Sequence, residues 1–256
     1  MRKLIGRVAA LALILLAVIL LHEHVRPQAA PEEMPDEPQQ ADAVTVTQAR
    51  EQLTLGAMQE NTDLGGVDIT VTGEDGTKAV YTFTDVEKNS WYADAVNFAV
   101  SNGLMNGVSD QPIFQPEYGI TRESFAVILY RLANGSPSEL RDYEDVPDDA
   151  WYREAVCWAT ANGCIPALTV NRFGVGEFVT CEQALSMLYR LAGAPETDAT
   201  LATYPYAPKV TASMYDAVAW AWESGLITEI ECVWYPTQAI SRAQVALLLM
   251  RYRAMI

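Results

Sequence analysis

The sequence has little histidine and little positive charge. Its only two histidines, His22 and His24, stand close together near the N-terminus. The rest of the chain therefore offers no Ser-His-Asp or Cys-His catalytic arrangement and no histidine ligand for a metal. Acidic residues outnumber basic ones by 33 to 17, which gives a formal net charge of −16. Because binding to nucleic acid relies on clustered lysine and arginine, this balance argues against a nucleic-acid partner.

Cysteine is also scarce. No two of the four cysteines form a Cys-x-x-Cys pair, the spacing that usually announces a zinc site, so we expect neither a metal nor a cofactor. Free cysteine behaves as a small buried hydrophobe, and we expect that role here. An even number of cysteines in an exported chain is also compatible with disulfides, and this alternative stays open. The cysteines are Cys157, Cys164, Cys181 and Cys232.

The first 26 residues are typical of an export segment. Three basic residues among the first seven precede an unbroken apolar run over residues 8–21. This run suits a secretory signal and is short for a spanning helix, which needs about 20 apolar residues. The sequence at 27–30 (PQAA) is a poor cleavage site, so residues 1–26 are either a cleaved signal peptide or a retained membrane anchor. In both cases the positive end stays inside and the rest of the chain is expected outside.

Two segments separate the export segment from the remaining chain. Residues 27–43 are rich in Pro, Gln, Glu and Ala and predict an acidic disordered linker. In residues 44–82, two β-prone runs flank Asp75-Gly76, a strong hairpin-turn signal. An isolated hairpin is marginal in water, so we expect this small segment to pack on the part of the chain that follows.

The remaining chain contains a threefold repeat. Residues 95–99 (AVNFA) return as AVCWA at 155–159 and as AVAWA at 217–221. The Ile-Thr-Arg of residues 120–122 corresponds to Val-Thr-Cys at 179–181 and to Ile-Ser-Arg at 240–242, at nearly the same distance from each copy. Fixed internal periods of this kind indicate repeat architecture. We assign the repeats to residues 83–135, 143–195 and 204–256.

Each repeat is predicted to contain two helices joined by a loop. Apolar residues fall at i, i+3, i+4 and i+7 from Tyr92 and again from Tyr152, which lines one face of a first helix. The second helix begins after Thr121, Thr180 or Ser241, all good N-caps, and the last two have glutamine at capping-box spacing. We expect the buried face of the second helix in the first repeat at Phe125, Ile128, Leu129 and Leu132. An aromatic anchor in the loop recurs as Phe114, Phe173 and Trp234.

These patterns resemble the S-layer homology domain. The shared features are an aromatic-x-Asp start (Phe83 to Asp85), a Trp-Tyr pair, a Gly-x-x-Asp loop from Gly107, and the Ile-Thr-Arg helix start. The three copies cover about two-thirds of the chain. The resemblance implies an all-α fold in which three helix-loop-helix repeats form a pseudo-threefold bundle, here with a small N-terminal hairpin-like segment. It also implies grooves between repeats that bind secondary cell-wall polysaccharide, often through a pyruvate ketal on a sugar.

The resemblance implies a glycan-binding set centred on an arginine of the second helix. Its planar guanidinium suits a carboxylate, and the helix N-terminus also favours an anion. The equivalent residue in the second repeat is Cys181, so we expect one competent groove in the first repeat, one partial groove and one structural groove. In the alternative interpretation, the arginine only pairs with a nearby carboxylate of the protein. The implied glycan-binding residues are Asp85, Trp91, Gly107, Thr121, Arg122 and Arg242.

We therefore expect an exported, non-catalytic protein that anchors to the wall through this polysaccharide, with a pyruvylated sugar as the recognised unit. Its expected location is extracytoplasmic, at the cell wall or cell surface, and the membrane is a partner only if the N-terminal segment is retained. A helical-repeat scaffold that binds a protein partner is the alternative. A wall-degrading enzyme with two carboxylates is disfavoured, because nothing beyond the repeats is long enough for a catalytic domain.

Overall fold

The computed structural model of the chain describes residues 66–72, 78–108, 112–229 and 233–256. The chain divides into two units, Met1–Glu37 and Pro38–Ile256, and every described residue belongs to the second unit. The predicted export segment, the predicted acidic linker and Cys232 all lie outside the described residues.

A two-stranded antiparallel sheet precedes the helices. Strand β1 (Gly66–Thr72) pairs with strand β2 (Lys78–Glu87), on either side of the Asp-Gly turn signal in the sequence. Val67 stands opposite Phe83, and the pairing becomes irregular at Gly66. Strand β2 is longer than the alternating pattern predicts, so the aromatic residue that opens the first repeat belongs to the sheet.

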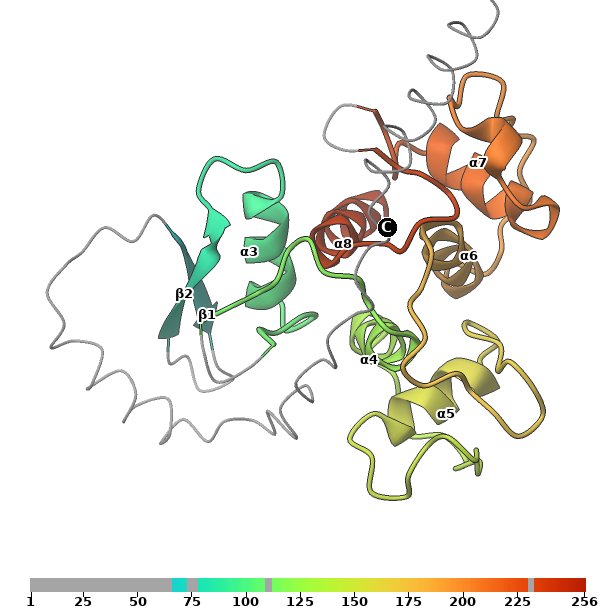
Figure 1. Cartoon of the computed structure of the whole chain (residues 1–256), viewed down its shortest axis with the longest axis horizontal. Helices are drawn as coiled ribbons and strands as arrows, with labels where there is room; N and C mark the ends of the chain where they lie inside the picture. Colours follow the sequence, from blue (N-terminus) through green and yellow to red (C-terminus); the bar gives the residue numbers. More distant parts are fainter. Residues whose placement is uncertain (1–65, 73–77, 109–111, 230–232) are drawn as a thin grey trace, which may run out of the picture. The chain divides into compact units, whose positions relative to one another are not determined.

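The sheet is held against the first helix, α3 (Ala93–Ser101). Ile69 of β1 is fully buried, and Phe83 and Val86 of β2 are also buried in the same core. These apolar contacts stabilise a hairpin that would be marginal alone. Figure 1 shows β1 and β2 beside α3.

Six α-helices and two 3-10 helices form the rest of the described chain. The predicted stripe of α3 is confirmed, since Ala95, Val96 and Ala99 have no exposed surface. Gly103 follows α3 with a φ of +66°, and this left-handed conformation ends the helix. The other helices are α4 (Arg122–Leu132), α5 (Arg153–Ala161), α6 (Cys181–Leu191), η1 (Ala207–Lys209), η2 (Ala212–Met214), α7 (Tyr215–Glu223) and α8 (Arg242–Met255).

The main contacts between helices join different repeats. Helix α4 packs on α5, α6 packs on α7, and α8 returns to pack on α3 (Figure 1). The second helix of each repeat therefore meets the first helix of the next one, and the third repeat closes onto the first. This order of contacts decides which residues can share a site.

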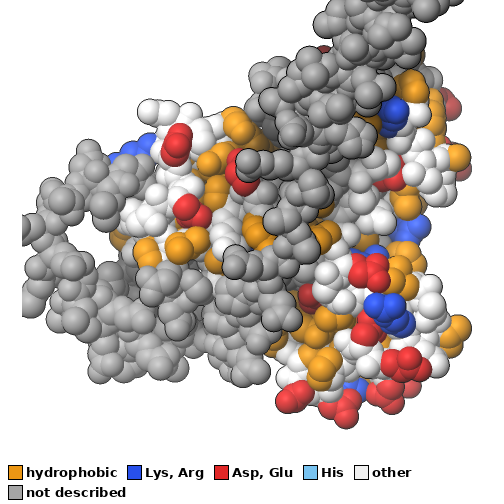
Figure 2. Space-filling view, in the orientation of Figure 1, with side chains coloured by type: hydrophobic (Ala, Val, Ile, Leu, Met, Phe, Trp, Pro, Cys, Tyr) orange, Lys and Arg blue, Asp and Glu red, His pale blue; other side chains and the backbone are white. Residues whose placement is uncertain are grey.

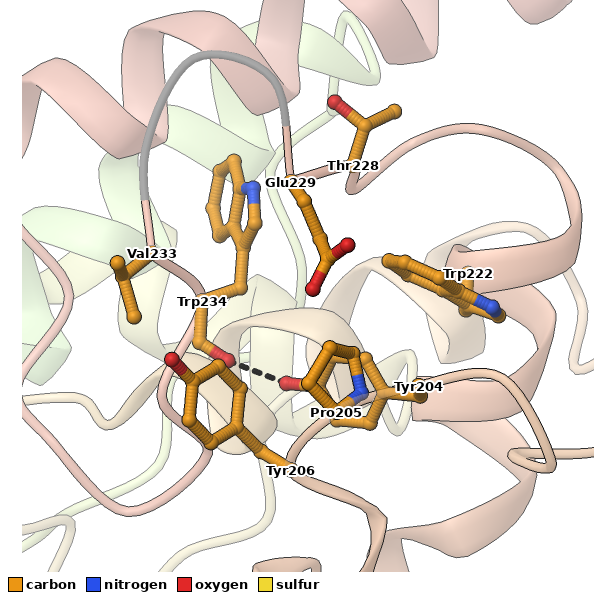
Figure 3. Close-up of a pocket in the computed structure, with 8 residues that line it drawn as sticks. All are labelled: Tyr204, Pro205, Tyr206, Trp222, Thr228, Glu229, Val233 and Trp234. Carbon is orange, nitrogen blue, oxygen red and sulfur yellow. Dashed lines mark hydrogen bonds between the residues drawn. The ribbon is translucent and has the colours of Figure 1, made fainter.

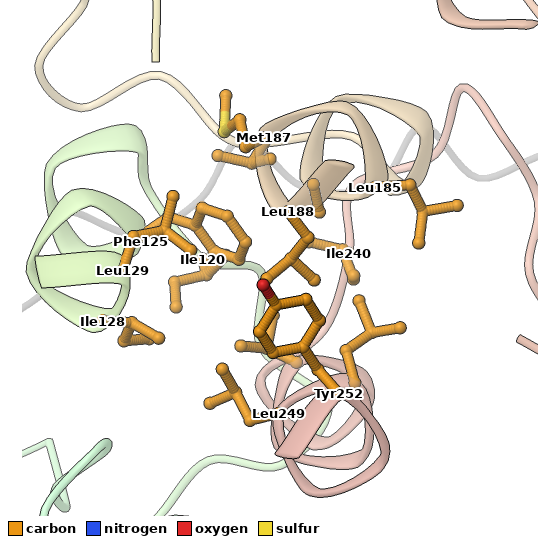
Figure 4. Packing of buried hydrophobic residues seen from close by; sticks show 14 of the residues in the cluster. Ile120, Phe125, Ile128, Leu129, Leu185, Met187, Leu188, Ile240, Leu249 and Tyr252 are labelled. Atoms are coloured by element: carbon orange, nitrogen blue, oxygen red, sulfur yellow. The ribbon is translucent and has the colours of Figure 1, made fainter. Parts of the chain in front are cut away.

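The helices α4, α6 and α8 meet in a common core. Figure 4 shows side chains of all three helices pointing toward one another, among them Phe125, Leu188 and Leu249. These three side chains are fully buried. The predicted buried face of α4 is confirmed, because Ile128, Leu129 and Leu132 are also at most 4% exposed.

A ring of backbone hydrogen bonds links the residues that precede these three helices. The N–H of Val179 donates to the carbonyl of Ile120 at 2.9 Å, and the N–H of Ile240 donates to the carbonyl of Val179 at 2.9 Å. The N–H of Ile120 completes the ring by donating to the carbonyl of Ile240 at 3.2 Å. Three buried apolar segments satisfy one another's backbone groups in this way. The three helix starts are thus fixed at one place in the structure.

The predicted helix caps are confirmed in two of three helices. Thr180 and Ser241 form complete capping boxes with the glutamine three residues later. Thr121 has the backbone conformation of an N-cap, but its side chain makes no capping bond. Its hydroxyl instead donates to Ser124 Oγ at 3.0 Å. The difference follows from the serine that stands where the other two helices have glutamine.

Candidate functional site

Arg122 opens α4 and reaches into the loop of the second repeat. Its Nε donates to the carbonyl of Phe173 at 3.1 Å, and its Nη2 donates to the carbonyl of Pro166 at 2.7 Å. The guanidinium carbon lies 5.0 Å from the centre of the Phe173 ring. Arg122 is only 4% exposed, and burial lowers its pKa from the ordinary value, against the opposing effect of nearby carboxylates such as Glu177. We call this contact the Arg122 interface.

Arg242 makes the same contact at the start of α8. Its Nε donates to the carbonyl of Phe114 at 2.7 Å, and its Nη2 donates to the carbonyl of Asn106 at 2.6 Å. The guanidinium carbon lies 4.6 Å from the centre of the Phe114 ring. We call this contact the Arg242 interface. In both interfaces the guanidinium joins the start of one repeat's second helix to the loop of another repeat.

The first N–H group of each of these helices is also paired. The N–H of Arg122 donates to the carbonyl of Glu177 at 2.9 Å, and the N–H of Arg242 donates to that of Tyr118 at 2.8 Å. The N–H of Cys181 donates in the same way to Gln238, at 2.9 Å. These helix starts therefore use their first donor on a loop of the protein, so this donor does not stand open to an anion.

The aspartate near the start of a repeat holds that repeat's own loop. Asp85 accepts hydrogen bonds from the N–H groups of Phe114 and Gln115, at 2.8 and 2.6 Å. Asp145 accepts three such bonds, from residues 173 to 175, at 2.6 to 2.9 Å. Burial raises the pKa of Asp145, but these backbone bonds outweigh burial and leave the pKa below its ordinary value.

The predicted site residues divide between two interfaces. Asp85 fixes the loop whose Phe114 carbonyl receives Arg242, so these residues belong to the Arg242 interface. Asp145 fixes the loop whose Phe173 carbonyl receives Arg122. The site residues of the first repeat are therefore divided between two interfaces, and which groove is competent stays a prediction. Each set combines the loop of one repeat with the helix start of another, so two interfaces have both the aspartate and the arginine.

The other predicted site residues have different environments. Trp91 is half-buried and packs edge-on against Tyr92, with ring centres 5.2 Å apart. Thr121 is 3% exposed, which leaves almost none of it accessible to a ligand. Gly107 has no room for a side chain, because an added Cβ would lie 2.8 Å from the Phe83 ring and 2.9 Å from the carbonyl of Ile113. Packing alone thus accounts for this glycine.

The third equivalent position holds Cys181, which is buried and supplies no guanidinium. A tyrosine instead donates a hydrogen bond to the carbonyl that is equivalent to those of Phe114 and Phe173. The hydroxyl of Tyr204 donates to the carbonyl of Trp234, the residue that corresponds to Phe114 and Phe173. Tyr204 is 5% exposed, and burial raises the pKa of its hydroxyl, with a smaller contribution from Cys181. We call the place where the start of α6 at Cys181 meets this loop, through its N–H bond to Gln238, the Cys181 interface.

Sequence reasoning missed Tyr204. The signal was present, because Tyr204 aligns with Phe83 and Tyr143 at the aromatic start of the other repeats. Only the contact in the structure, which lies within the third repeat, shows that its hydroxyl binds the carbonyl that an arginine of another repeat binds in the other two interfaces. A pocket of about 120 Å³ lies beside it (Figure 3). Its lining residues are Tyr204, Pro205, Tyr206, Trp222, Thr228, Glu229, Val233 and Trp234.

The described residues contain no group of three histidine, cysteine, aspartate or glutamate side chains that could hold a metal ion. Cys157, Cys164 and Cys181, the cysteines within the described ranges, are buried and not in disulfides.

No helix in the described stretches combines the length and apolar character that crossing a bilayer requires. Figure 2 shows acidic side chains spread over the face in view, with fewer basic ones among them.

Comparison with known proteins identifies one domain. Residues 82–126 match the S-layer homology domain family. This segment includes Asp85, helix α3, the loop with Phe114 and the start of α4 with Arg122. It therefore contains the loop side of the Arg242 interface and the helix side of the Arg122 interface.

Three relatives share part of the chain. Endo-1,4-beta-xylanase A of Thermoanaerobacterium saccharolyticum is 29% identical over 108 residues, which cover 42% of this chain and 9% of that protein. A cell surface protein of Thermoanaerobacter kivui is 28% identical over 129 residues, or 48% and 17%. A surface-layer 125 kDa protein of Lysinibacillus sphaericus is 36% identical over 93 residues, or 35% and 8%. The chain spans less than a fifth of each relative.

Proposed function

We propose that this chain is a non-catalytic anchoring module at the outer cell surface, and that its three repeats are S-layer homology repeats that bind secondary cell-wall polysaccharide. The observation that carries the proposal is the S-layer homology match at residues 82–126, which contains parts of both arginine interfaces. Two of the three relatives are named as cell-surface or surface-layer proteins, which supports an extracytoplasmic location.

The xylanase relative does not favour an enzymatic role for this chain. The similarity covers 9% of that protein, too little to carry its whole activity across. We propose that this chain has no hydrolytic activity on xylan.

The arginine interfaces are the proposed wall-binding places. Their two guanidinium groups are positive charges on a chain with a net charge of −16, so they are the part of each interface best suited to a pyruvyl carboxylate. Because both are nearly buried and hold loop carbonyls, we propose that they mainly fix the loops around the polymer. Direct contact with sugars is assigned to the more accessible Trp91 and to the loop at Gly107. We assign no direct sugar contact to Asp85 and Thr121, which help to hold the loop and the helix start in place.

The net charge also shapes how the polymer would be recognised. A chain with 33 acidic residues repels an anionic polymer at long range, so its affinity must come from local geometry. This favours binding of short, defined sugar units over general attraction to a charged polymer.

A sedimentation assay with purified wall tests the proposal. The full chain should bind intact wall, bind less to wall whose pyruvyl groups have been removed, and bind least after the secondary polymer is extracted. Trp91→Ala should lose about 0.5–1.5 kcal/mol of binding free energy, because it removes the ring on which a sugar is proposed to stack. Equal binding to intact and polymer-extracted wall would refute glycan anchoring, and would favour a scaffold that binds a protein of the wall.

A further inference from the structure

The pocket in the third repeat, defined above by its eight lining residues and here called the aromatic pocket, is unlike the two arginine interfaces. Four of its lining residues are aromatic, one is glutamate, and none is lysine or arginine. Its volume of about 120 Å³ suits one small chemical group or the edge of a single sugar ring. Figure 3 shows these side chains arranged around an open centre.

The aromatic rings form the walls of this pocket. The rings of Tyr204 and Trp222 lie 5.2 Å apart at 55°, and those of Tyr204 and Tyr206 lie 6.0 Å apart at 76°. Steep angles of this kind prevent the rings from stacking flat on one another. Trp222 is further fixed by its Nε1, which donates to Thr203 Oγ1 at 2.9 Å, and Tyr206 packs on Tyr235 at 5.2 Å. The walls are thus braced by contacts outside the pocket.

The charge of the pocket favours a cation. Glu229 is exposed, and Figure 3 shows its carboxylate directed toward the aromatic side chains. Aromatic faces attract ammonium groups, and a carboxylate beside them adds to that attraction while it repels an anion. The other two interfaces already hold a cation of the chain itself, since Arg122 and Arg242 lie over the corresponding phenylalanine rings. The Cys181 interface has no such cation, because cysteine carries no positive charge.

The second feature of the pocket is a buried hydrogen-bond donor without a partner among the described residues. Trp234 is 2% exposed, and its indole Nε1 has no hydrogen-bond partner among the described residues. An indole N–H can only donate, and leaving a buried donor unpaired is costly. A ligand hydroxyl or ring oxygen would satisfy it, whereas a bare ammonium ion would not. The pocket therefore presents an acceptor for a cation at Glu229 and a donor for an oxygen at Trp234.

From this arrangement we infer that the aromatic pocket binds a sugar that carries a free ammonium group, as an unacetylated amino sugar does. This inference rests on the proposed function, because it assigns the amino sugar to the wall glycan. The third repeat then recognises a part of the glycan with the opposite charge to the carboxylate proposed for the arginine interfaces.

A matched pair of sugars tests the inference on the full chain. Titration with glucosamine and with N-acetylglucosamine, followed by ligand-observed NMR, compares one ring with and without its positive charge. Glucosamine should bind about tenfold more tightly than N-acetylglucosamine. Tetramethylammonium and lysine methyl ester, which lack the sugar oxygens, should bind less tightly than glucosamine. Equal binding of the two sugars would overturn the cationic preference, and equal binding of lysine methyl ester would overturn the assignment to a sugar.

Two substitutions of glutamate provide a matched control. Glu229→Gln removes the pocket charge with little change of shape and should weaken glucosamine binding about tenfold. Glu223→Gln removes an equal charge from the exposed end of α7, outside the pocket lining, and should leave binding unchanged. Equal effects of the two variants would show that only the net charge matters and would refute the subsite.

The wall sedimentation assay separates this inference from the proposed function. If the full chain binds intact wall but not glucosamine, the amino-sugar subsite fails and the anchoring proposal stands. If it binds glucosamine but sediments equally with polymer-extracted wall, the anchoring proposal fails and the pocket chemistry stands.

Discussion

Replacing Arg242 with methionine tests whether the arginines hold the repeats together. The change keeps an unbranched apolar side chain and removes the guanidinium, which holds the carbonyls of Phe114 and Asn106 at 2.7 and 2.6 Å. It leaves two acceptors without this donor, each at a cost of about 1–3 kcal/mol. Water can reach Asn106, which is half-buried, and relief of the buried charge offsets part of the loss. We therefore expect a net loss of about 2–4 kcal/mol in the free energy of unfolding.

Urea unfolding followed by circular dichroism measures this loss, with the midpoint expected to fall at an unchanged m-value. Arg141→Met is the matched control. Arg141 also donates to a carbonyl, that of Val170 at 2.9 Å, and lies over the Tyr143 ring, but its side chain is exposed. Its loss should cost less than about 1 kcal/mol. If Arg242→Met costs no more than Arg141→Met, the arginine does not tie the repeats together.

Three further predictions follow from the packing and the titrating groups. Leu129→Ala should lower the unfolding free energy by about 2–5 kcal/mol, because Leu129 is fully buried, and a smaller loss in urea melts would show that α4 can collapse around the cavity. Thr180→Ala should cost about 1 kcal/mol through its capping box. Thr121→Ala tests the same cap where the side-chain bond is absent, and equal losses would show that the bond contributes nothing. The hydroxyl of Tyr130 donates to Glu154, and this bond raises the pKa of Tyr130 from an ordinary 10 to about 12. The stability that this bond contributes should be fully present below pH 10 and be lost as the pH rises toward 12, and Tyr130→Phe should remove that part of the pH dependence in alkaline melts.

Much of the local structure could be predicted from the sequence. The apolar stripes of α3 and α4, the glycine after α3 and the capping boxes of α6 and α8 all follow from short-range rules that act within one or two turns. Thr121 is the N-cap residue of α4 as predicted, but its hydroxyl donates to Ser124 and makes no capping bond, for an equally local reason.

The candidate site could not be predicted in the same way. Its composition depends on which repeat packs on which, and a repeat pattern lists equivalent residues without saying which copies meet. Asp85 and Arg122 share a repeat in the sequence, yet Asp85 supports the loop that receives Arg242. The replacement of an arginine by Tyr204 is likewise visible only in contacts about 30 residues apart along the chain.

Direct titration with polymer tests whether this chain binds wall polysaccharide, as the proposed anchoring requires. A purified fragment of the secondary wall polymer is titrated into the full chain by calorimetry, with the same fragment lacking its pyruvyl groups as the comparison. We expect saturable binding of the intact fragment and weaker binding of the fragment without pyruvyl groups. Absence of binding to either fragment, by a chain that still sediments with whole wall, would contradict the proposal.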